Sequence, residues 1–293
     1  MAVKPKNGMT CARWERSRKM FDTFQSRLTV AGYLVAESPL RVGAGHATEL
    51  VDAELPVIRD QHDRPFIPGS SLKGALRSHL EALVRGKVPP DADLKHLACD
   101  PTGDECLNAE QMRRLKNKYR DDDAGLAEAV TGKSCLLCQT FGSPWFASPV
   151  RVRDLPIVAN EWFGQFDVRD GVAIDRDKGT VAVGPYDYEV VPAGTRFELY
   201  ITAENLADWQ RGLLWLGLRA LERGDVALGG FTGRGLGWVR LEGCHVRLVE
   251  GAQALIDLLG GVGAGEEVND EKAKPWVDEL LFKLGRKGER QNA

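Results

Sequence analysis

The chain has 293 residues, of which 43% are hydrophobic and 28% are charged, a composition that excludes global disorder. Its 39 basic and 42 acidic side chains give a net charge of -3, so charge alone neither supports nor excludes binding to nucleic acid. No apolar run approaches the roughly 18 residues of a membrane span, and the basic start of the chain lacks the apolar core of a secretory signal. We therefore expect a cytoplasmic protein with no membrane partner.

The predicted elements begin, after an N-terminal extension of residues 1–20, with a strand over residues 27–37, which is rich in Val, Leu and Tyr. The stretch 62–86 contains a predicted helix that Ser70 or Ser71 caps and that Gly86 and two following prolines end. Its apolar face is defined by leucines at helical spacing, namely Leu72, Leu76, Leu80 and Leu83.

Residues 150–195 mix short apolar runs with Gly, Pro and Asp, which indicates strands that carry a long protruding hairpin. The elements expected after them are strands over 197–203, 237–243 and 244–249 and helices over 209–223, 252–259 and 275–285. Strand, helix, strands, helix and strand in this order predict an α+β fold of the ferredoxin-like or RRM-like type. We expect one main domain over 21–250 and a C-terminal helical segment over 251–293.

Four cysteines form two pairs, Cys99 with Cys106 and Cys135 with Cys138. The second pair has the spacing of a zinc knuckle, and four thiolates satisfy a tetrahedral zinc ion that is closed to water. The polar segment 91–140 around them cannot build a core of its own, a problem that structural metals solve. The alternatives are a disulfide, which a cytoplasmic setting disfavours, or a redox pair, which needs a thioredoxin-like context that is absent here.

The segment Pro-Gly-Ser-Ser-Leu-Lys-Gly at residues 68–74 superficially resembles a phosphate-binding loop but does not match the nucleotide triphosphatase pattern. The free N–H groups of a helix start, with Lys73 and Arg77 one turn apart, would still hold a phosphate. Taken alone, the segment is better explained as an ordinary capped helix with solvated basic side chains.

A second glycine cluster, residues 229–237, lies after a predicted helix and before a predicted strand, which is the wrong order for a dinucleotide-binding loop. With Arg234 as its charge, it fits a backbone-lined surface for a phosphate chain better than a simple connection. No catalytic triad stands out in the sequence. His46 lies in a glycine turn, and Asp52, Glu54, Asp60 and Asp63 form an acidic loop that is equally typical of a solvated surface.

Together these motifs resemble the RAMP superfamily, in particular the backbone subunits of type III CRISPR–Cas effector complexes and most of all their type III-D branch. The resemblance runs from about residue 20 to residue 241. Its motifs, in chain order, are LRVGAG, LPVIRD, RPFIPGSSLKGALRSHLE, CLLCQTFGSP, VRVRD, GVAIDRDKGTVAVGPYDYEVVPAGTRFEL and ALGGFTGRGLGWV.

The resemblance implies an RRM-like palm with a zinc-bound insertion over 91–140 and a hairpin over about 167–190, the thumb, that displaces nucleotides at regular intervals. Such subunits stack along a CRISPR guide RNA, beside other Cas subunits and copies or paralogues of themselves, and pair that guide with a target RNA. The residues that would contact RNA are Gly43, Gly45, His46, Ser70, Ser71, Lys73, Arg77, Gly233, Arg234 and Gly235.

Active members of this family cut the target RNA with an acidic residue and a divalent metal such as Mg²⁺ or Mn²⁺. The family position, two residues before the proline of the Pro-Val pair, typically holds aspartate and here holds Glu54, with Asp52 as the nearest aspartate. Three hypotheses follow: a guide-bound subunit that cleaves target RNA through Asp52 or Glu54, a non-catalytic scaffold of the same complex, or a stand-alone endoribonuclease that processes CRISPR transcripts with His46 as acid–base group.

Overall fold

The computed structural model describes residues 23–43, 55–87, 94–174, 176–263 and 265–289. Its centre is an antiparallel sheet in the order β10-β9-β1-β7-β3, and β8 adds a short pair with β9. The strands are β1 (Ser26–Ala36), β3 (Val150–Val152), β7 (Arg196–Glu204), β8 (Val226–Ala227), β9 (Trp238–Glu250) and β10 (Glu266–Glu267). The predicted α+β class is confirmed.

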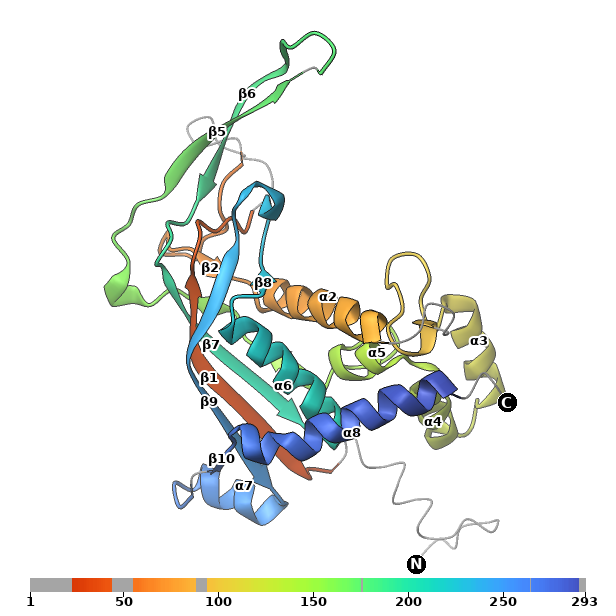
Figure 1. Ribbon diagram of the computed structural model, residues 1–293. Helices are drawn as coiled ribbons and strands as arrows, with labels where there is room; N and C mark the ends of the chain where they lie inside the picture. The colour runs from red at the N-terminus through yellow and green to blue at the C-terminus, as the bar shows by residue number, and fades with distance from the viewer. Residues whose placement is uncertain (1–22, 44–54, 88–93, 175, 264, 290–293) are drawn as a thin grey trace, which may run out of the picture.

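The core lies between this sheet and helices on one of its faces, α2 (Gly69–Lys87), α6 (Asp208–Glu222) and α8 (Asp270–Glu289), as Figure 1 shows. Alternate residues of β1, among them Leu28, Val30 and Leu34, are at most 3% exposed because every second side chain of a strand points to the same face. The alternation keeps the same phase on both sides of Gly32, although the register of β1 with β9 changes there.

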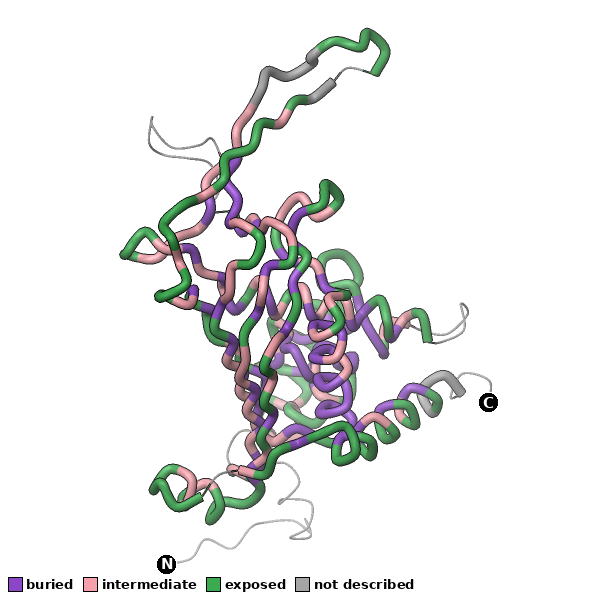
Figure 2. Tube along the Cα trace, turned by 60° about the vertical axis from the view of Figure 1, so that its left-hand side comes forward, coloured by how far each residue is buried: buried purple, intermediate pink, exposed green. Residues whose placement is uncertain are grey.

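Two insertions extend from the sheet and its helices. The first, between α2 and β3, is helical and contains η1 (Leu94–His96), α3 (Ala109–Lys118), α4 (Asp123–Lys133) and α5 (Leu136–Phe141). The second, between β3 and β7, contains β4 (Leu155–Pro156), which pairs with β2 (Phe66–Ile67), then η2 (Ala159–Glu161) and the hairpin of β5 (Asp167–Ile174) and β6 (Val181–Val190). The hairpin projects well beyond the body (Figures 1 and 2).

The predicted start and apolar face of α2 need correction. The helix begins at Gly69, so Ser70 and Ser71 lie in its first turn and do not cap it, and the Gly69 N–H donates to Asp154 Oδ1 at 2.8 Å. Leu83 is 41% exposed, whereas Val84, four residues after Leu80, is fully buried. The buried face therefore follows a strict four-residue spacing to the end of the helix.

The C-terminal part also differs from the prediction. The two strands expected over 237–249 are one continuous strand, β9, because Gly243 at φ +56° accommodates the irregular register opposite Gly32. Helix α8 starts at Asp270, before the predicted 275, because Asn269 Oδ1 accepts from the Lys272 N–H at 3.0 Å and caps it. Helix α7 (Ala252–Leu259) lies where it was predicted. Among the described residues, no helix has both the length and the apolar character needed to span a membrane.

Candidate nucleic-acid interface and metal centre

The four predicted cysteine ligands lie together. Their Sγ atoms are all within 4.8 Å of one another and all four residues are buried. The Sγ of Cys99 is 3.6 Å from those of Cys135 and Cys138, close to the separation of about 3.8 Å expected between sulfurs of a tetrahedral zinc site. That distance is far longer than the roughly 2.05 Å of a disulfide bond. The cluster is thus a buried four-cysteine group that could hold a metal ion.

Local structure explains how the two pairs meet. Cys135 is the N-cap of α5, and its Sγ accepts the backbone N–H of Cys138 at 3.3 Å, which is how a Cys-x-x-Cys knuckle turns both sulfurs inward. The Leu136 N–H donates to Leu97 O at 3.2 Å and brings the first pair alongside. Hydrogen bonds from Cys106, Cys138 and Cys99 lower the pKa of Cys135 against the opposing effect of burial.

Arg77, which the sequence assigned to RNA phosphates, points instead at this cluster. Its Nη2 lies 3.4 Å from Cys138 Sγ, its Nη1 donates to Gly142 O at 2.9 Å, and its Nε donates to Glu81 Oε1 at 2.7 Å. The guanidinium is therefore engaged with protein groups on every side. The predicted contact of Arg77 with a guide phosphate would have to compete with these protein groups.

The N-terminal turn of α2 presents a smaller polar surface than its motif suggested. The Asp154 carboxylate accepts a hydrogen bond from the Gly69 N–H, and Pro68 O accepts one from the Ser71 N–H at 2.9 Å. Lys73 Nζ donates to Val150 O at 2.8 Å, and burial lowers its pKa. A lysine ammonium has three donors, so this bond leaves Lys73 with capacity for a further acceptor.

The late glycine loop packs against the turn that follows β1. A Cβ on Gly229 would lie 2.2 Å from Arg41 O, so this position tolerates no side chain. The Gly230 N–H also donates to Arg41 O, at 2.8 Å. Around Gly233, by contrast, a Cβ would meet nothing within 4 Å, and Gly235 has φ +84°. The loop thus closes tightly on one side and leaves open backbone on the other.

Arg41 is a site residue that the sequence analysis missed. Its guanidinium lies 5.1 Å from the Phe231 ring, which Arg234 approaches from 4.8 Å. Burial lowers the pKa of Arg41, and its buried Nε has no hydrogen-bond partner. Within the described part of the chain, no carboxylate forms an ion pair with it. An arginine so placed favours binding of an external anion. In the sequence, the one signal that could have identified Arg41 is its position in the motif LRVGAG.

The base of the hairpin meets the same surface. Tyr188 of β6 packs edge-on against Phe231 with ring centroids 4.9 Å apart, and Tyr186 OH accepts from Arg234 Nη1 at 2.5 Å. Phe231 has a left-handed backbone, φ +60°, which is uncommon for an aromatic residue and typical of functional loops. Glycine loop, Arg41 and hairpin base therefore form one surface at one end of the sheet, which we call the Arg41 surface.

The two candidate catalytic residues, Asp52 and Glu54, lie outside the described residues, as do Gly45 and His46. The flanking residues are described: Gly43 forms an isolated bridge with Val57, and Leu55 forms one with Tyr188. Leu55, the described residue that follows the acidic pair, thus lies beside the hairpin base of the Arg41 surface.

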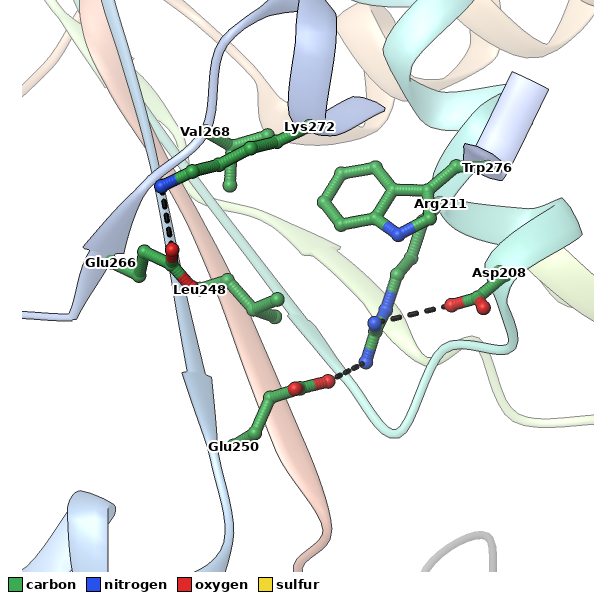
Figure 3. A pocket seen from close by; sticks show the side chains of 8 residues that line it. All are labelled: Asp208, Arg211, Leu248, Glu250, Glu266, Val268, Lys272 and Trp276. Atoms are coloured by element: carbon green, nitrogen blue, oxygen red, sulfur yellow. Dashed lines mark hydrogen bonds and ion pairs between the residues drawn. The ribbon is translucent and has the colours of Figure 1, made fainter. Parts of the chain in front are cut away.

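A pocket of about 490 Å³ lies elsewhere, between α6, the end of β9, β10 and α8 (Figure 3). Its charges are already paired: Arg211 contacts Asp208 at 3.2 Å and Glu250 at 3.0 Å, and Lys272 contacts Glu266 at 2.6 Å. The pocket therefore holds ion pairs that join α6 and α8 to the sheet, and we assign it no binding role.

An antiparallel sheet covered by helices on one face, with a projecting hairpin and a glycine-lined cationic surface at one end, defines an α+β protein suited to binding a polyanion. Residues 33–240 match the family model of the RAMP superfamily. Because this match spans most of the chain, the chain belongs to the RAMP superfamily, as its motifs predicted.

Three relatives share one name, CRISPR system Cms endoribonuclease Csm3. The protein of Methanocaldococcus jannaschii is 27% identical over 231 residues, which cover 74% of this chain and 79% of that protein. The protein of Methanothermobacter thermautotrophicus is 26% identical over 252 residues, 76% of this chain and 87% of that protein. The protein of Enterococcus italicus is 40% identical over 66 residues, 22% of this chain and 30% of that protein.

Proposed function

We propose that this chain is a CRISPR RNA-binding backbone subunit of a type III antiviral effector complex. The observation that carries the proposal is the Arg41 surface, where a cation without a carboxylate partner among the described residues lies against the backbone of Gly230 and an aromatic ring, in the same loop as the open glycine Gly233. Such a surface suits an RNA phosphate, and it occurs in a chain of the RAMP superfamily with relatives named for a CRISPR system.

We further propose a division of the chain into a palm over 21–250, a metal-binding insertion over 91–140, a thumb over about 167–190 and a helical segment over 251–293 after the 1–20 extension. The order β9-β1-β7-β3, with α2 following β1 and α6 following β7, supports a ferredoxin-like palm. The projection of β5 and β6 supports the thumb (Figure 1).

In this proposal the guide RNA crosses the end of the sheet in the cytoplasm, bound between neighbouring copies and other type III subunits. Arg41 and Arg234 would bind phosphates, Gly233 and Gly235 would admit the RNA backbone, and Ser70, Ser71 and Lys73 would contact it from the start of α2. Gly43, Gly45 and His46 would lie along the same path.

The test is to purify the chain with its genomic neighbours, extract the bound nucleic acid and sequence it. We expect RNA that carries CRISPR repeat sequence, and we expect its recovery to fall when Arg41 and Arg234 are both replaced by Gln. Complexes that assemble but contain no such RNA would refute the proposal.

A second proposal concerns cleavage, which the shared name endoribonuclease of the relatives favours. Asp52 or Glu54 would hold Mg²⁺ or Mn²⁺ against a target-RNA phosphate. The 2′-OH of the preceding nucleotide would attack that phosphorus and give its proton to water, and the bond to the 5′-oxygen would break as that oxygen takes a proton from water, which leaves a cyclic phosphate and a 5′-hydroxyl. The carboxylate would hold the metal ion in place, and the positive charge of that ion would neutralise the negative charge on the phosphate oxygens.

Complementary target RNA and divalent metal, offered to the purified complex, distinguish the cleavage hypotheses. Regularly spaced cuts that disappear in the Asp52→Ala, Glu54→Ala double variant support cleavage by this chain. Cuts that persist in that variant, or no cuts at all, leave it a scaffold. Cleavage of precursor RNA by the isolated chain, lost in His46→Ala, would instead support the stand-alone processing enzyme.

We also propose that the cysteine cluster holds a structural zinc ion, since four buried sulfurs at tetrahedral spacing suit that metal and leave no site open for a substrate. Elemental analysis of the purified chain is expected to give close to one zinc per chain, and Cys135→Ser is expected to lose it. Folded protein without bound metal would refute this assignment.

A further inference from the structure

Helix α2 turns a row of three charged side chains, Arg77, Glu81 and Arg85, toward the cysteine cluster. They recur every four residues, so they lie on one face of the helix. Glu81 is only 7% exposed, and its two oxygens contact Arg77 Nε at 2.7 Å and Arg85 Nη2 at 3.6 Å. Removing a carboxylate and its arginine partners from water costs free energy, so these three residues are not explained as a solvated helix surface.

The two arginines bind opposite halves of the cluster. Arg77 reaches Cys138 Sγ at 3.4 Å and Gly142 O at 2.9 Å, next to the second cysteine pair. Arg85 donates to Ala98 O at 3.1 Å and to Cys99 O at 2.9 Å, next to the first pair. The row therefore bridges the two chain segments that a metal would join, and it does so from the helix that begins at the proposed RNA-binding end of the palm.

Charge balance explains this arrangement. Four thiolates around a divalent ion carry a net charge of −2, and a buried anion needs a nearby cation and hydrogen-bond donors. Arg77 supplies both, because its guanidinium keeps its positive charge and donates directly to a sulfur. Glu81 holds Arg77 in that orientation through the Nε hydrogen bond.

We propose that Arg77, oriented by Glu81 and assisted by Arg85, is the positioning residue that balances the thiolate charge of the metal centre and couples metal binding to α2. The inference rests on the proposed metal centre and is independent of RNA binding. Loss of Arg77 weakens metal binding through the sulfur, whereas loss of Arg85 removes two contacts with backbone carbonyls and a longer contact with Glu81, none of them with a sulfur.

The test measures the Zn²⁺ affinity of the full-length chain by competition with a chelator of known affinity. Arg77→Gln is expected to bind about 10-fold to 100-fold more weakly, the range found when groups that hydrogen-bond to metal ligands are removed. Arg113→Gln is the matched control, since Arg113 is exposed on α3 of the same insertion, and it is expected to stay within about twofold of the parent. Equal affinities for the two variants would overturn the inference.

Cobalt(II) spectroscopy gives a readout that a merely structural role would not change. The sulfur-to-cobalt charge-transfer band is expected to move to longer wavelength in Arg77→Gln, because a lost N–H···S bond raises the energy of the sulfur electrons, and to stay unmoved in Arg85→Gln. If Arg77→Gln does not fold, Arg77→Lys provides the same test, since one ammonium cannot reproduce all three contacts. An unmoved band in the Arg77 variant overturns the inference, and a parent chain that binds no metal refutes the proposed centre itself.

Discussion

At the scale of single residues, the structure separates glycines that the packing requires from glycines that it does not. A Cβ on Gly69 would lie 2.3 Å from Val152 O and 2.7 Å from Arg153 O, so α2 can start this close to β3 only without a side chain. Gly74, in the next turn of the same helix, would place its Cβ more than 4 Å from any other group. The same substitution should therefore have opposite effects at the two positions.

We expect Gly69→Ala to destabilise the protein by about 1–3 kcal/mol, the usual range for forcing an extra carbon into a packed site. Gly74→Ala is expected to be neutral or to stabilise the protein by up to about 1 kcal/mol, because alanine is the better helix former. Urea denaturation of both variants measures the difference. A Gly69→Ala variant as stable as Gly74→Ala would mean that α2 does not dock on β3 as described.

At Arg41, the proposed contact with RNA and the stability of the free chain make opposite demands, because the cation is partly buried and its Nε has no hydrogen-bond partner. Replacement by Met removes a partly buried cation, so we expect unchanged or higher stability together with weaker guide-RNA binding. The slope of RNA affinity against salt concentration should fall by about one, as it does when one phosphate contact is lost. Fluorescence anisotropy over a salt series measures both effects, with Arg113→Met as the control. An unchanged slope would count against a phosphate contact at Arg41.

At the scale of elements, the hairpin is fixed to the body through Glu189. Its carboxylate accepts from Arg59 Nη2 at 2.7 Å and from the Val57 N–H at 3.1 Å, and its own N–H donates to Leu55 O at 3.2 Å. The Glu189 side chain is only 10% exposed, so solvent screens these contacts little. The hairpin base and the end of the acidic segment are thereby held as one unit.

Glu189→Gln is expected to cost about 1–3 kcal/mol, because the partly buried Arg59 loses the more buried of its two carboxylate partners and keeps only Asp63, while the Val57 N–H keeps an acceptor. Hydrogen exchange should rise at residues 55–59 and at the base of β6 before it rises in the sheet. Glu198→Gln is a suitable control, since that glutamate lies on β7 outside this anchor. Equal exchange at residues 55–59 in both variants would show that Glu189 is not the anchor.

The sequence predicted the elements better than the contacts of their side chains. The helical spacing of leucines predicted α2, but the choice between Leu83 and Val84 depended on which side α6 would occupy, and no local pattern states that. The cysteine pairs were found because metal ligands have a fixed spacing. The contact of Arg77 with Cys138 was not foreseen, because a motif gives the position of a residue along a helix, whereas this partner is 61 residues away in the chain. Arg41 was missed for a related reason, since its importance comes from Phe231 and Gly230, which only the fold brings to it.

At the scale of the whole molecule, α2 connects two sites that lie apart in the sequence. Its first turn lies at the proposed RNA-binding end of the palm, and its second half holds both segments of the cysteine cluster through Arg77 and Arg85. Leu72, Leu76 and Leu80 of the same helix are at most 1% exposed in the main core. A change in the cluster can therefore reach the main core through one helix, without any rearrangement of the sheet.

Removal of the metal should test this connection in the intact chain. Without an ion, four buried sulfurs and the Arg77 guanidinium lose their common partner, so we expect hydrogen exchange to rise first in residues 97–99 and α5, then in α2, while β1 and β7 keep their protection. RNA affinity should fall after chelation and return when Zn²⁺ is added back. Chelation of the Cys135→Ser variant serves as the control, because that variant should already show both changes. Unchanged exchange in α2 after metal loss would mean that the insertion folds independently of the palm, and the row of charges on α2 would then only fasten it in place.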